Sequence, residues 1–214
     1  MKARPKIAQL HYITQDIEGT SHTQLAFEAC RAGVELVQLR IKNQSFDEHL
    51  RIARKVKSIC QQYGVQLIIN DSLEIACAVE ADGVHLGNAD MPHTLARKRL
   101  GIHKLIGATA YSAEEATHHL RVGIADYIGL GTFRPTQTKP EITTFLTLEE
   151  IAQLIQAHPA LGSSCPIIAI GGIRLTDIQP LLQAGVHGIA VASLINRAND
   201  KPAITQAIFS HLNR

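Results

Sequence analysis

Short apolar runs alternate with longer amphipathic segments along the whole chain, and this alternation constrains the fold more than any other feature. The apolar runs are Ile7–Ile13, Val34–Ile41, Val65–Ile69, Gly83–Leu86, Lys104–Gly107, Asp126–Leu130, Ile167–Ile170 and His187–Val191. The amphipathic segments include Thr23–Ala32, Phe46–Tyr63, Ala113–Val122, Leu148–Ala157 and Thr176–Ala184. Strands that alternate with helices favour parallel pairing with right-handed crossovers. Eight such units in 214 residues predict an α/β fold, a single (β/α)8 TIM barrel over residues 1–214, with a doubly wound open sheet as the alternative.

A glycine recurs between a predicted helix end and the next apolar run. It occurs in Ala32-Gly33-Val34, Asp82-Gly83-Val84, Val122-Gly123-Ile124 and Ala184-Gly185-Val186. Glycine readily adopts the left-handed backbone conformation that commonly ends a helix. We therefore expect these glycines to close helices before the following strands.

The composition excludes several classes of protein. Hydrophobic residues make up 45% and charged residues 19% of the chain, and a formal net charge of +2 indicates no general surface for nucleic acid or membranes. The four cysteines lie far apart, form no CxxC pair and are predicted to be free thiols: Cys30, Cys60, Cys77 and Cys165. No run approaches the length of a membrane span, and residues 1–9 lack the apolar segment of a signal peptide. We therefore expect a reduced, cytoplasmic protein.

Polar and apolar side chains alternate at the end of the second predicted strand, where residues 34–42 read VELVQLRIK. Successive strand side chains point to opposite faces, so Gln38, Arg40 and Lys42 should project together into the barrel mouth. The residues that should face the helices are Val37, Leu39 and Ile41. Two cations in a barrel mouth are costly without an anion to pair with them. A solvated strand face is the alternative, but helices should cover this strand, and we favour an anion site.

Carboxylates follow the third and fourth predicted strands. Asp71 comes directly after Ile69-Asn70, and Asp90 lies in the turn after Leu86. Two carboxylates at neighbouring strand ends repel one another unless one is protonated or a cation lies between them. Oxygen ligands beside a phosphate site suit Mg²⁺, which commonly takes one or two carboxylates together with phosphate oxygens and water. The sequence therefore predicts a magnesium site at Asp71 and Asp90.

Residues suited to phosphate binding follow the last three predicted strands. The segment Gly129–Pro140 contains threonine hydroxyls and Lys139, which can donate hydrogen bonds and positive charge to a phosphate. Gly171-Gly172 follows the seventh strand, and Ala192-Ser193 follows the eighth. Loops after barrel strands seven and eight frequently form a phosphate site. We predict a second anion pocket there, without metal.

The histidines are assigned lesser roles. His118 and His119 lie on a predicted surface helix with no third ligand, and both are expected to be solvated. His85 is expected in the fourth strand, in the core or behind the site. Serines and cysteines show neither a nucleophile elbow nor triad spacing.

Together these motifs resemble the thiamine phosphate synthase family from the second predicted strand to the eighth. The matching blocks are Gln38-Leu39-Arg40-Ile41-Lys42, Ile69-Asn70-Asp71, Gly87-Asn88-Ala89-Asp90-Met91-Pro92, Pro135-Thr136-Gln137-Thr138-Lys139, Ile170-Gly171-Gly172-Ile173 and Val191-Ala192-Ser193. No single block is decisive, but their order and shared location at strand ends make the combination specific. The resemblance implies a Mg²⁺-dependent transferase. It would condense 4-amino-2-methyl-5-hydroxymethylpyrimidine diphosphate with 4-methyl-5-hydroxyethylthiazole phosphate, or its carboxylated form, and release pyrophosphate.

The resemblance also implies roles for the residues at matching positions. The pyrimidine diphosphate would be bound by Gln38, Leu39, Arg40, Ile41, Lys42, Asn70, Thr109 and Lys139. The thiazole phosphate would be bound by Thr136, Gln137, Thr138, Gly172, Ala192 and Ser193. Asp71 and Asp90 would hold Mg²⁺, and the catalytic cations would be Arg40, Lys42 and Lys139, which neutralise charge on the leaving pyrophosphate. The thiazole nitrogen would then capture the pyrimidine cation.

The sequence departs from the family pattern at four positions. Ser72 follows Asp71 where a second acidic residue is common, and Tyr111 stands where His or Cys is common. Thr132 replaces a frequent Pro, and Pro140 replaces a frequent basic residue. These departures put loop closure and substrate fit in question but leave the predicted metal pair and basic residues intact.

Three other functions are the alternatives. A thiazole tautomerase would need neither a diphosphate site nor Mg²⁺, and Tyr111 replaces the histidine that would favour its proton transfer. A non-catalytic phosphate-ligand sensor would keep the pockets without turnover, and an epimerase rests on the analogy of fold alone. The intact basic and acidic motifs favour the synthase. The expected partners are phosphorylated small molecules rather than nucleic acid or membranes; a homo-oligomer and Mn²⁺ in place of Mg²⁺ are left open.

Overall fold

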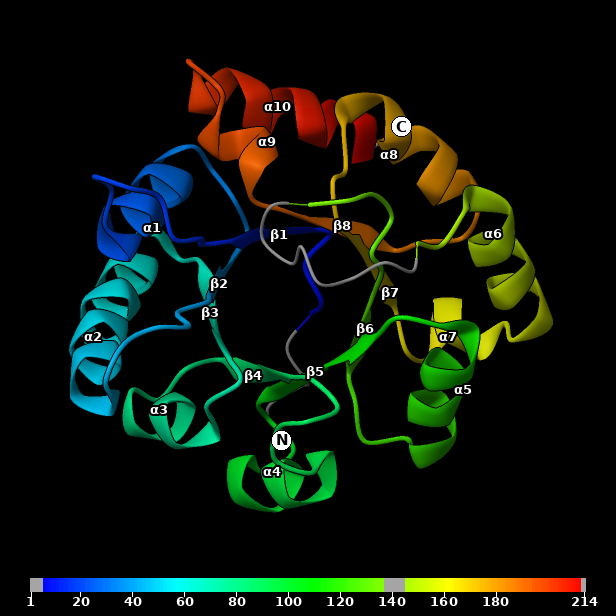
Figure 1. Ribbon diagram of the computed structural model, residues 1–214, viewed down its shortest axis with the longest axis horizontal. Coiled ribbons are helices and arrows are strands. Elements are labelled where there is room, and N and C mark those ends of the chain that lie inside the picture. Colours follow the sequence, from blue (N-terminus) through cyan, green and yellow to red (C-terminus); the bar gives the residue numbers. More distant parts are fainter. Residues whose placement is uncertain (1–5, 137–144, 213–214) are drawn as a thin grey trace.

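The computed structural model describes residues 6–136 and 145–212 of the chain. Within these ranges, eight parallel strands close into a barrel in chain order, and β8 pairs with β1 (Figure 1). The strands are β1 (Leu10–Ile13), β2 (Leu36–Leu39), β3 (Gln66–Asn70), β4 (Gly83–Leu86), β5 (Leu105–Ala110), β6 (Tyr127–Leu130), β7 (Ile167–Ile170) and β8 (Gly188–Val191). The predicted TIM barrel is confirmed. The alternative, an open sheet, is wrong because the first and last strands, β1 and β8, pair with each other.

Helices surround the barrel (Figure 1). They are α1 (His22–Arg31), α2 (Phe46–Tyr63), α3 (Leu73–Ala78), α4 (His93–Leu100), α5 (Ala113–Val122), α6 (Leu148–Ala157), α7 (Ala160–Ser163), α8 (Leu175–Gln183), α9 (Ser193–Asn196) and α10 (Lys201–Leu212). The predicted ranges of α2, α5 and α6 agree with the structure. In the described part of the chain, none of these helices has the length and apolar character to cross a bilayer.

Capping side chains explain where many of the helices begin. A Ser or Thr hydroxyl accepts a hydrogen bond from a backbone N–H in the first turn of α1, α2, α3, α5 and α6; these caps are Ser21, Ser45, Ser72, Ser112 and Thr147. Each such cap stabilises a helix by about 1 kcal/mol. Ser72, a departure from the family pattern, therefore has a structural role at the start of α3.

The recurrent glycines close helices at three of the four predicted places. Gly33, Gly123 and Gly185 have positive φ angles, as a left-handed helix end requires. Gly83 is the exception, because it is the first residue of β4 and does not have a positive φ. A Cβ at Gly83 would lie 2.2 Å from the carbonyl oxygen of Leu105 on β5. The prediction was wrong there because close strand packing, rather than a helix end, requires the glycine.

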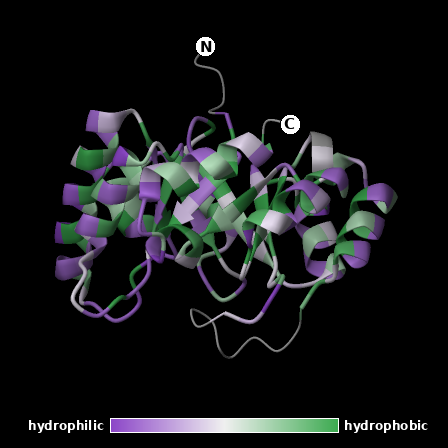
Figure 2. Cartoon of the chain, turned by 90° about the horizontal axis from the view of Figure 1, so that it is seen from above, coloured by the Kyte–Doolittle hydropathy of each residue, from purple (hydrophilic) through white to green (hydrophobic). Residues whose placement is uncertain are grey.

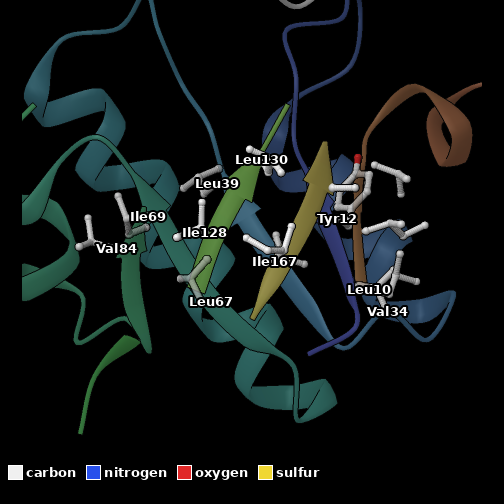
Figure 3. Packing of buried hydrophobic residues seen from close by; sticks show 14 of the residues in the cluster. Leu10, Tyr12, Val34, Leu39, Leu67, Ile69, Val84, Ile128, Leu130 and Ile167 are labelled. Atoms are coloured by element: carbon white, nitrogen blue, oxygen red, sulfur yellow. The ribbon is translucent and has the colours of Figure 1, made fainter. Parts of the chain in front are cut away.

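Apolar side chains form two layers. The larger layer lies between strands and helices and includes Leu39, Leu67, Ile69, Ile128 and Leu130 (Figure 3). Alternate strand residues form two smaller clusters within the barrel: Ala8, Leu36, Ile68 and Leu105, and Ile13, Tyr127, Ile168 and Ala190. The helices carry hydrophilic residues on their outer faces (Figure 2). The barrel is therefore a packed core, open only where the strands end.

A partly buried arginine connects the elements at the end of the barrel where the strands begin. Arg97 of α4 donates to the carbonyl oxygens of Gly101 and Lys104 at 2.8 and 2.7 Å and to the carboxylate of Asp126 at 2.5 Å. Asp126 also accepts from the backbone N–H of Ile106 at 2.8 Å. Removing one partner of a buried ion pair leaves an uncompensated charge. This pair therefore fixes α4 and the starts of β5 and β6, far from the strand ends.

The packing of β8 against β1 gives a prediction about stability. A Cβ on Gly188 would lie 2.2 Å from the carbonyl oxygen of Gln9, so Gly188→Ala should lower the free energy of unfolding by roughly 3 kcal/mol. The matched control is Gly162→Ala in α7, where the nearest atom to the new Cβ is 3.7 Å away and φ is not positive. That variant should be neutral or up to about 1 kcal/mol more stable. Urea unfolding measures both, and equal stability of the two variants would contradict this account.

A buried histidine gives a prediction about pH. The ring of His11 packs edge-on against Tyr127 at 5.0 Å and donates to the carbonyl oxygen of Ala8 at 3.1 Å. Burial lowers the pKa of His11 to about 3. The hydrogen bond to Ala8 opposes this shift, and the charge of His187 adds a smaller lowering. The unfolded chain binds a proton at His11 below pH 6.5 whereas the folded chain does not, so stability falls as the pH falls from 6.5 towards 3.

We expect His11→Gln to remove on the order of 2 kcal/mol of the stability difference between pH 7 and pH 4.5. Urea unfolding at the two pH values measures that difference. His118→Gln, which replaces an exposed histidine, should leave it unchanged. The assignment fails if His11→Gln and the wild type lose the same stability on acidification.

Candidate active site at the carboxyl ends of the strands

A cavity of about 410 Å³ lies where the strands end. Its polar lining includes Gln38, Arg40, Lys42, Asn70, Asp71, His85, Asn88, Asp90, Thr109, Tyr111, Thr132, Thr136 and Ser193. Its apolar lining includes Ile13, Ile170, Ile173, Ala190 and Leu194. The carboxyl ends of barrel strands are where the active sites of this fold lie. The cavity therefore brings together most of the site residues predicted from the sequence.

The basic residues lie beyond the end of β2. Gln38 is buried within the strand, and Arg40 and Lys42 follow it with their side chains on the same side, as the alternation predicted. The backbone N–H of Arg40 donates to the Thr14 hydroxyl at 3.0 Å, and the N–H of Thr14 donates to the Gln38 carbonyl oxygen at 3.0 Å. These bonds extend the pairing of β1 and β2 past the last residue of β2. The backbone that carries the two cations is therefore held by β1.

Two residues of the predicted diphosphate site lie elsewhere. Leu39 and Ile41 are buried in the outer layer, between the strands and the helices, and their side chains do not line the cavity. The alternation that turns the Arg40 side chain inward turns these two side chains outward, so any contact that Leu39 and Ile41 make with a diphosphate would come from their backbone.

The two predicted metal ligands lie side by side. Asp71 follows β3 with a left-handed φ of 66°, and its N–H donates to the carbonyl oxygen of His85 at 2.8 Å. A carboxylate oxygen of Asp90 accepts from the N–H of Gly87 at 2.7 Å. Burial raises the pKa of Asp90, and the charge of Asp71 raises it further, whereas the bond from Gly87 and the charge of Lys42 oppose this shift. The expected closeness of the two carboxylates is confirmed.

One of the carboxylates also contacts one of the basic residues, because the ammonium of Lys42 donates to Asp71. Within residues 6–136 and 145–212, no group of three His, Cys, Asp or Glu side chains forms a metal cage. Mg²⁺ does not need such a cage, since it commonly takes one or two carboxylates and completes its coordination with phosphate oxygens and water. Burial and, to a lesser extent, the charge of Asp71 raise the pKa of Asp90, and a bound cation would offset both effects. The donor set therefore fits Mg²⁺ bound together with a diphosphate.

The floor of the cavity is a hydrogen-bonded network that joins two predicted site residues, Gln38 and Thr109, to His85 and Tyr127, which were not predicted to line the site. His85 bonds through Nε2 to the Thr109 hydroxyl at 2.9 Å and through Nδ1 to the Tyr127 hydroxyl at 3.1 Å. Gln38 donates to the Tyr127 hydroxyl as well, while burial raises the pKa of Tyr127. The network joins β2, β4, β5 and β6 beneath the cavity. It fixes the ring of His85 and the hydroxyl of Thr109, the latter a predicted contact of the pyrimidine substrate.

Glycines on neighbouring strands make room for His85. Gly107 pairs with His85 in the β4–β5 register, and a Cβ there would lie 2.4 Å from its Nδ1 atom. A Cβ at Gly129 on β6 would lie 3.0 Å from the His85 Cε1 atom. The signal that could have found His85 is therefore a polar residue at an inward position beside strand glycines. Reading it requires the strand register, which a single sequence does not give.

The expectation for the histidine pair of α5 needs correction. His118 is exposed, but His119 is buried and donates through Nε2 to the carbonyl oxygen of Thr109 at 3.1 Å. Burial lowers the pKa of His119. Adjacent residues of a helix point in directions about 100° apart, so one can face the barrel while the other faces water. His119 thus supports the strand that carries Thr109.

The loops after β6, β7 and β8 form the opposite side of the cavity. Thr136, Gly172, Ala192 and Ser193 line it, as predicted for the thiazole phosphate site. Gly172 has a φ of 62°, a left-handed conformation that leaves backbone groups open to a ligand. The remaining predicted residues of this region, Gln137, Thr138 and Lys139, lie outside the described residues, as does Pro140. Tyr111 and Thr132, two departures from the family pattern, both line the cavity.

The sequence comparisons with known proteins agree on one enzyme family. The family model for thiamine monophosphate synthase matches residues 10–195. The thiamine-phosphate synthase of Flavobacterium johnsoniae is 38% identical over 200 residues, which cover 94% of each chain. The enzyme of the same name from Phocaeicola vulgatus is 38% identical over 205 residues, covering 96% of this chain and 98% of that one.

A solved structure is similar as well. The thiamine phosphate pyrophosphorylase of Pyrococcus furiosus superposes with a TM-score of 0.82 at 31% sequence identity, with 96% of each chain covered. The family match spans all eight strands and contains the basic, acidic and glycine-rich segments that meet in the cavity. The chain therefore belongs to the thiamine monophosphate synthase family of transferases.

Proposed function

We propose that this chain, acting as one catalytic domain over residues 1–214, condenses hydroxymethylpyrimidine diphosphate with hydroxyethylthiazole phosphate, or its carboxylated form, to give thiamine phosphate and pyrophosphate. The observation that carries the proposal is the division of one cavity into two chemically different sides. Cations and carboxylates gather at the ends of β2, β3 and β4, and glycines and hydroxyls gather after β6, β7 and β8. One side suits a diphosphate with its metal, and the other suits a single phosphate.

The charged side would bind the diphosphate. Arg40 and Lys42 supply positive charge, and Asn70 and Gln38 supply amide donors at the same strand ends. Asp71 and Asp90 would hold Mg²⁺, which when bound neutralises charge on the leaving pyrophosphate; Mn²⁺ could replace it. Lys139 is proposed as a further cation from the family pattern alone. Asp71 also orients the ammonium of Lys42 through the bond between them.

The reaction that follows needs no protein nucleophile. The C–O bond to the diphosphate breaks with its electron pair leaving on pyrophosphate, and the thiazole nitrogen forms the new C–N bond to the pyrimidine cation. Arg40 and Lys42 stabilise charge as it develops on the leaving group. The apolar wall formed by Ile13, Ile170 and Ile173 keeps water away from the cation, so the thiazole nitrogen reacts first.

The floor and the opposite side would place the two rings. Thr109, held by His85, would contact the pyrimidine, and Thr136, Gly172, Ala192 and Ser193 would bind the thiazole phosphate. A cytoplasmic location is also proposed, and the four free cysteines support it because disulfides are rare there.

The direct test is pyrophosphate release by purified protein given both substrates with Mg²⁺, and then with excess EDTA. We expect release that needs both substrates and the metal, with an equal amount of thiamine phosphate formed. Omitting the thiazole phosphate should reduce release to the background of slow hydrolysis. Isomerisation of the thiazole without pyrophosphate release would overturn the proposal in favour of a tautomerase.

Substitution of a predicted metal ligand tests whether the two sides of the cavity bind different substrates. Asp71→Asn should lower kcat by on the order of 10²–10³ and raise the Mg²⁺ concentration needed for half-maximal rate. The KM for the thiazole phosphate should change little, because Thr136 and Gly172 lie on the other side. Calorimetric titration of Mg²⁺ in the presence of pyrophosphate should show weaker binding.

The matched control is Asp82→Asn. Asp82 also accepts from a lysine, Lys57 at 3.2 Å, and from the N–H of Leu67 at 2.9 Å, but at the start of the strands. This variant should retain both the metal dependence and the rate. Equal loss of metal-dependent turnover and thiazole phosphate binding in folded Asp71→Asn protein would count against the proposed division.

A further inference from the structure

The loop after β6 lies directly on the turn after β7. The N–H of Phe133 donates to the carbonyl oxygen of Ile170 at 2.9 Å, and the N–H of Arg134 donates to that of Gly171 at 3.0 Å. These bonds continue the pairing of β6 with β7 beyond Leu130. The backbone position of the first loop is therefore set by the second.

The two segments are too close for side chains between them. Gly171 and Gly172 have φ angles of 100° and 62°. A Cβ at Gly171 would lie 2.4 Å from the Thr132 Cγ2 atom, and one at Gly172 would lie 2.8 Å from the Arg134 Cβ atom. The turn after β7 can pack this closely against the loop after β6 only because both of these positions are glycine.

An ion pair holds this contact from the outside. The guanidinium of Arg134 donates to both carboxylate oxygens of Asp177, in the first turn of α8, with one N–O distance of 2.8 Å. Asp177 also accepts from the N–H of Arg174 at 2.8 Å. Its side chain is only 9% exposed, whereas that of Arg134 is 34% exposed. Burial opposes ionisation of Asp177, but the bonds from Arg134 and Arg174 hold its pKa below the ordinary value.

The direction of Arg134 is fixed by further contacts. Its guanidinium lies 4.7 Å from the centre of the Phe133 ring, a cation–π contact. Planar bidentate pairing with Asp177 adds geometric specificity to the attraction between the charges. Neither Arg134 nor Asp177 lines the cavity, whereas Thr136, two residues after Arg134, and Gly172 both do. The pair can influence a ligand only through those neighbours.

We propose that Arg134 and Asp177 are positioning residues that hold Thr136 opposite Gly172 and so set the geometry of the phosphate site after β6, β7 and β8. The inference rests on the proposed function, since it names the thiazole phosphate as the ligand that senses this geometry. A phosphate bound by hydroxyl and backbone groups from two loops binds well only when both loops keep their separation. The ion pair keeps that separation without contacting the phosphate.

A double-mutant cycle tests the proposal. Asp177→Asn retains an oxygen that can accept from the N–H of Arg174 but removes the charge that Arg134 pairs with, and Arg134→Gln removes the guanidinium. Each variant should raise the KM for the thiazole phosphate about tenfold, a loss of about 1.4 kcal/mol of binding. The KM for the pyrimidine diphosphate should stay within a factor of about two, because its site lies on the other side. Arg134→Gln with Asp177→Asn should be no worse than either single variant, because all three lack the same contact.

The matched control is Asp126→Asn. Asp126 also accepts from an arginine, Arg97, and from a backbone N–H, that of Ile106, but at the opposite end of the barrel. The Asp126→Asn variant should lower the melting temperature, and it should not raise the KM for the thiazole phosphate relative to the KM for the pyrimidine diphosphate. Arg134→Lys, which keeps the charge but not the bidentate geometry, should restore part of the thiazole phosphate affinity.

Several outcomes would overturn the proposal in active protein. Equal rises in both KM values, or none, would make the ion pair merely structural. Additive effects in the cycle would show that the two residues act separately. If the KM for the thiazole phosphate rose in Arg134→Gln but not in Asp177→Asn, Arg134 would instead be a direct ligand of the phosphate. Failure of the proposed function would be distinct, since the wild type would then form no thiamine phosphate.

Discussion

Pairing of β8 with β1 closes the sheet, and the geometry of the site depends on it. The ladder joins Leu10 to Ile189, His11 to Ala190 and Tyr12 to Val191. Closure brings the loops after the last strands round to face those after the first ones, so residues far apart in the chain line one cavity. An open sheet with the same strands would spread these side chains along an edge. Closure also explains the demand for glycine at position 188, where the two strands are too close for a Cβ.

Charge is distributed unevenly around the mouth of the barrel. Near β2, β3 and β4, the cations Arg40 and Lys42 and the carboxylates Asp71 and Asp90 line the same side of the cavity, and Lys42 bonds to Asp71. The pKa of Asp90 is raised by burial and by the nearby negative charge. A metal bound with a diphosphate would neutralise both sets of charges, because the metal supplies positive charge to the carboxylates and the diphosphate supplies negative charge to Arg40 and Lys42. Across the cavity, the charges of Arg134 and Asp177 neutralise each other behind the lining. That leaves hydroxyls and backbone to meet a ligand there.

The sequence predicted the elements with strong local signals and missed what depends on register. The helix Phe46–Tyr63 was assigned correctly because a serine cap precedes it, a left-handed glycine follows it, and its apolar positions repeat. The strand predicted as Lys104–Gly107 runs from Leu105 to Ala110 in the structure. Its second half was missed because Gly107, Ala108 and Ala110 are poor strand formers. Alternation identified Gln38, Arg40 and Lys42 within one strand. The position of His85 in the fourth strand was predicted, but its bonds to Thr109 and Tyr127 were not, and His119 was wrongly expected to be solvated. The surroundings of both histidines come from neighbouring strands and helices, and a lone sequence does not show which residues of those elements lie opposite.

The glycines that line the cavity also affect the thermodynamics of binding. At Gly171 and Gly172 the wall consists of backbone, and bonds from the N–H groups of Phe133 and Arg134 to the carbonyl oxygens of Ile170 and Gly171 hold that backbone in place. A ligand that packs there immobilises no protein side chain along this part of the contact surface. Ordering each mobile side chain at an interface costs roughly 0.5–1.5 kcal/mol. The rigid wall avoids that entropic cost, and more of the contact free energy remains as affinity.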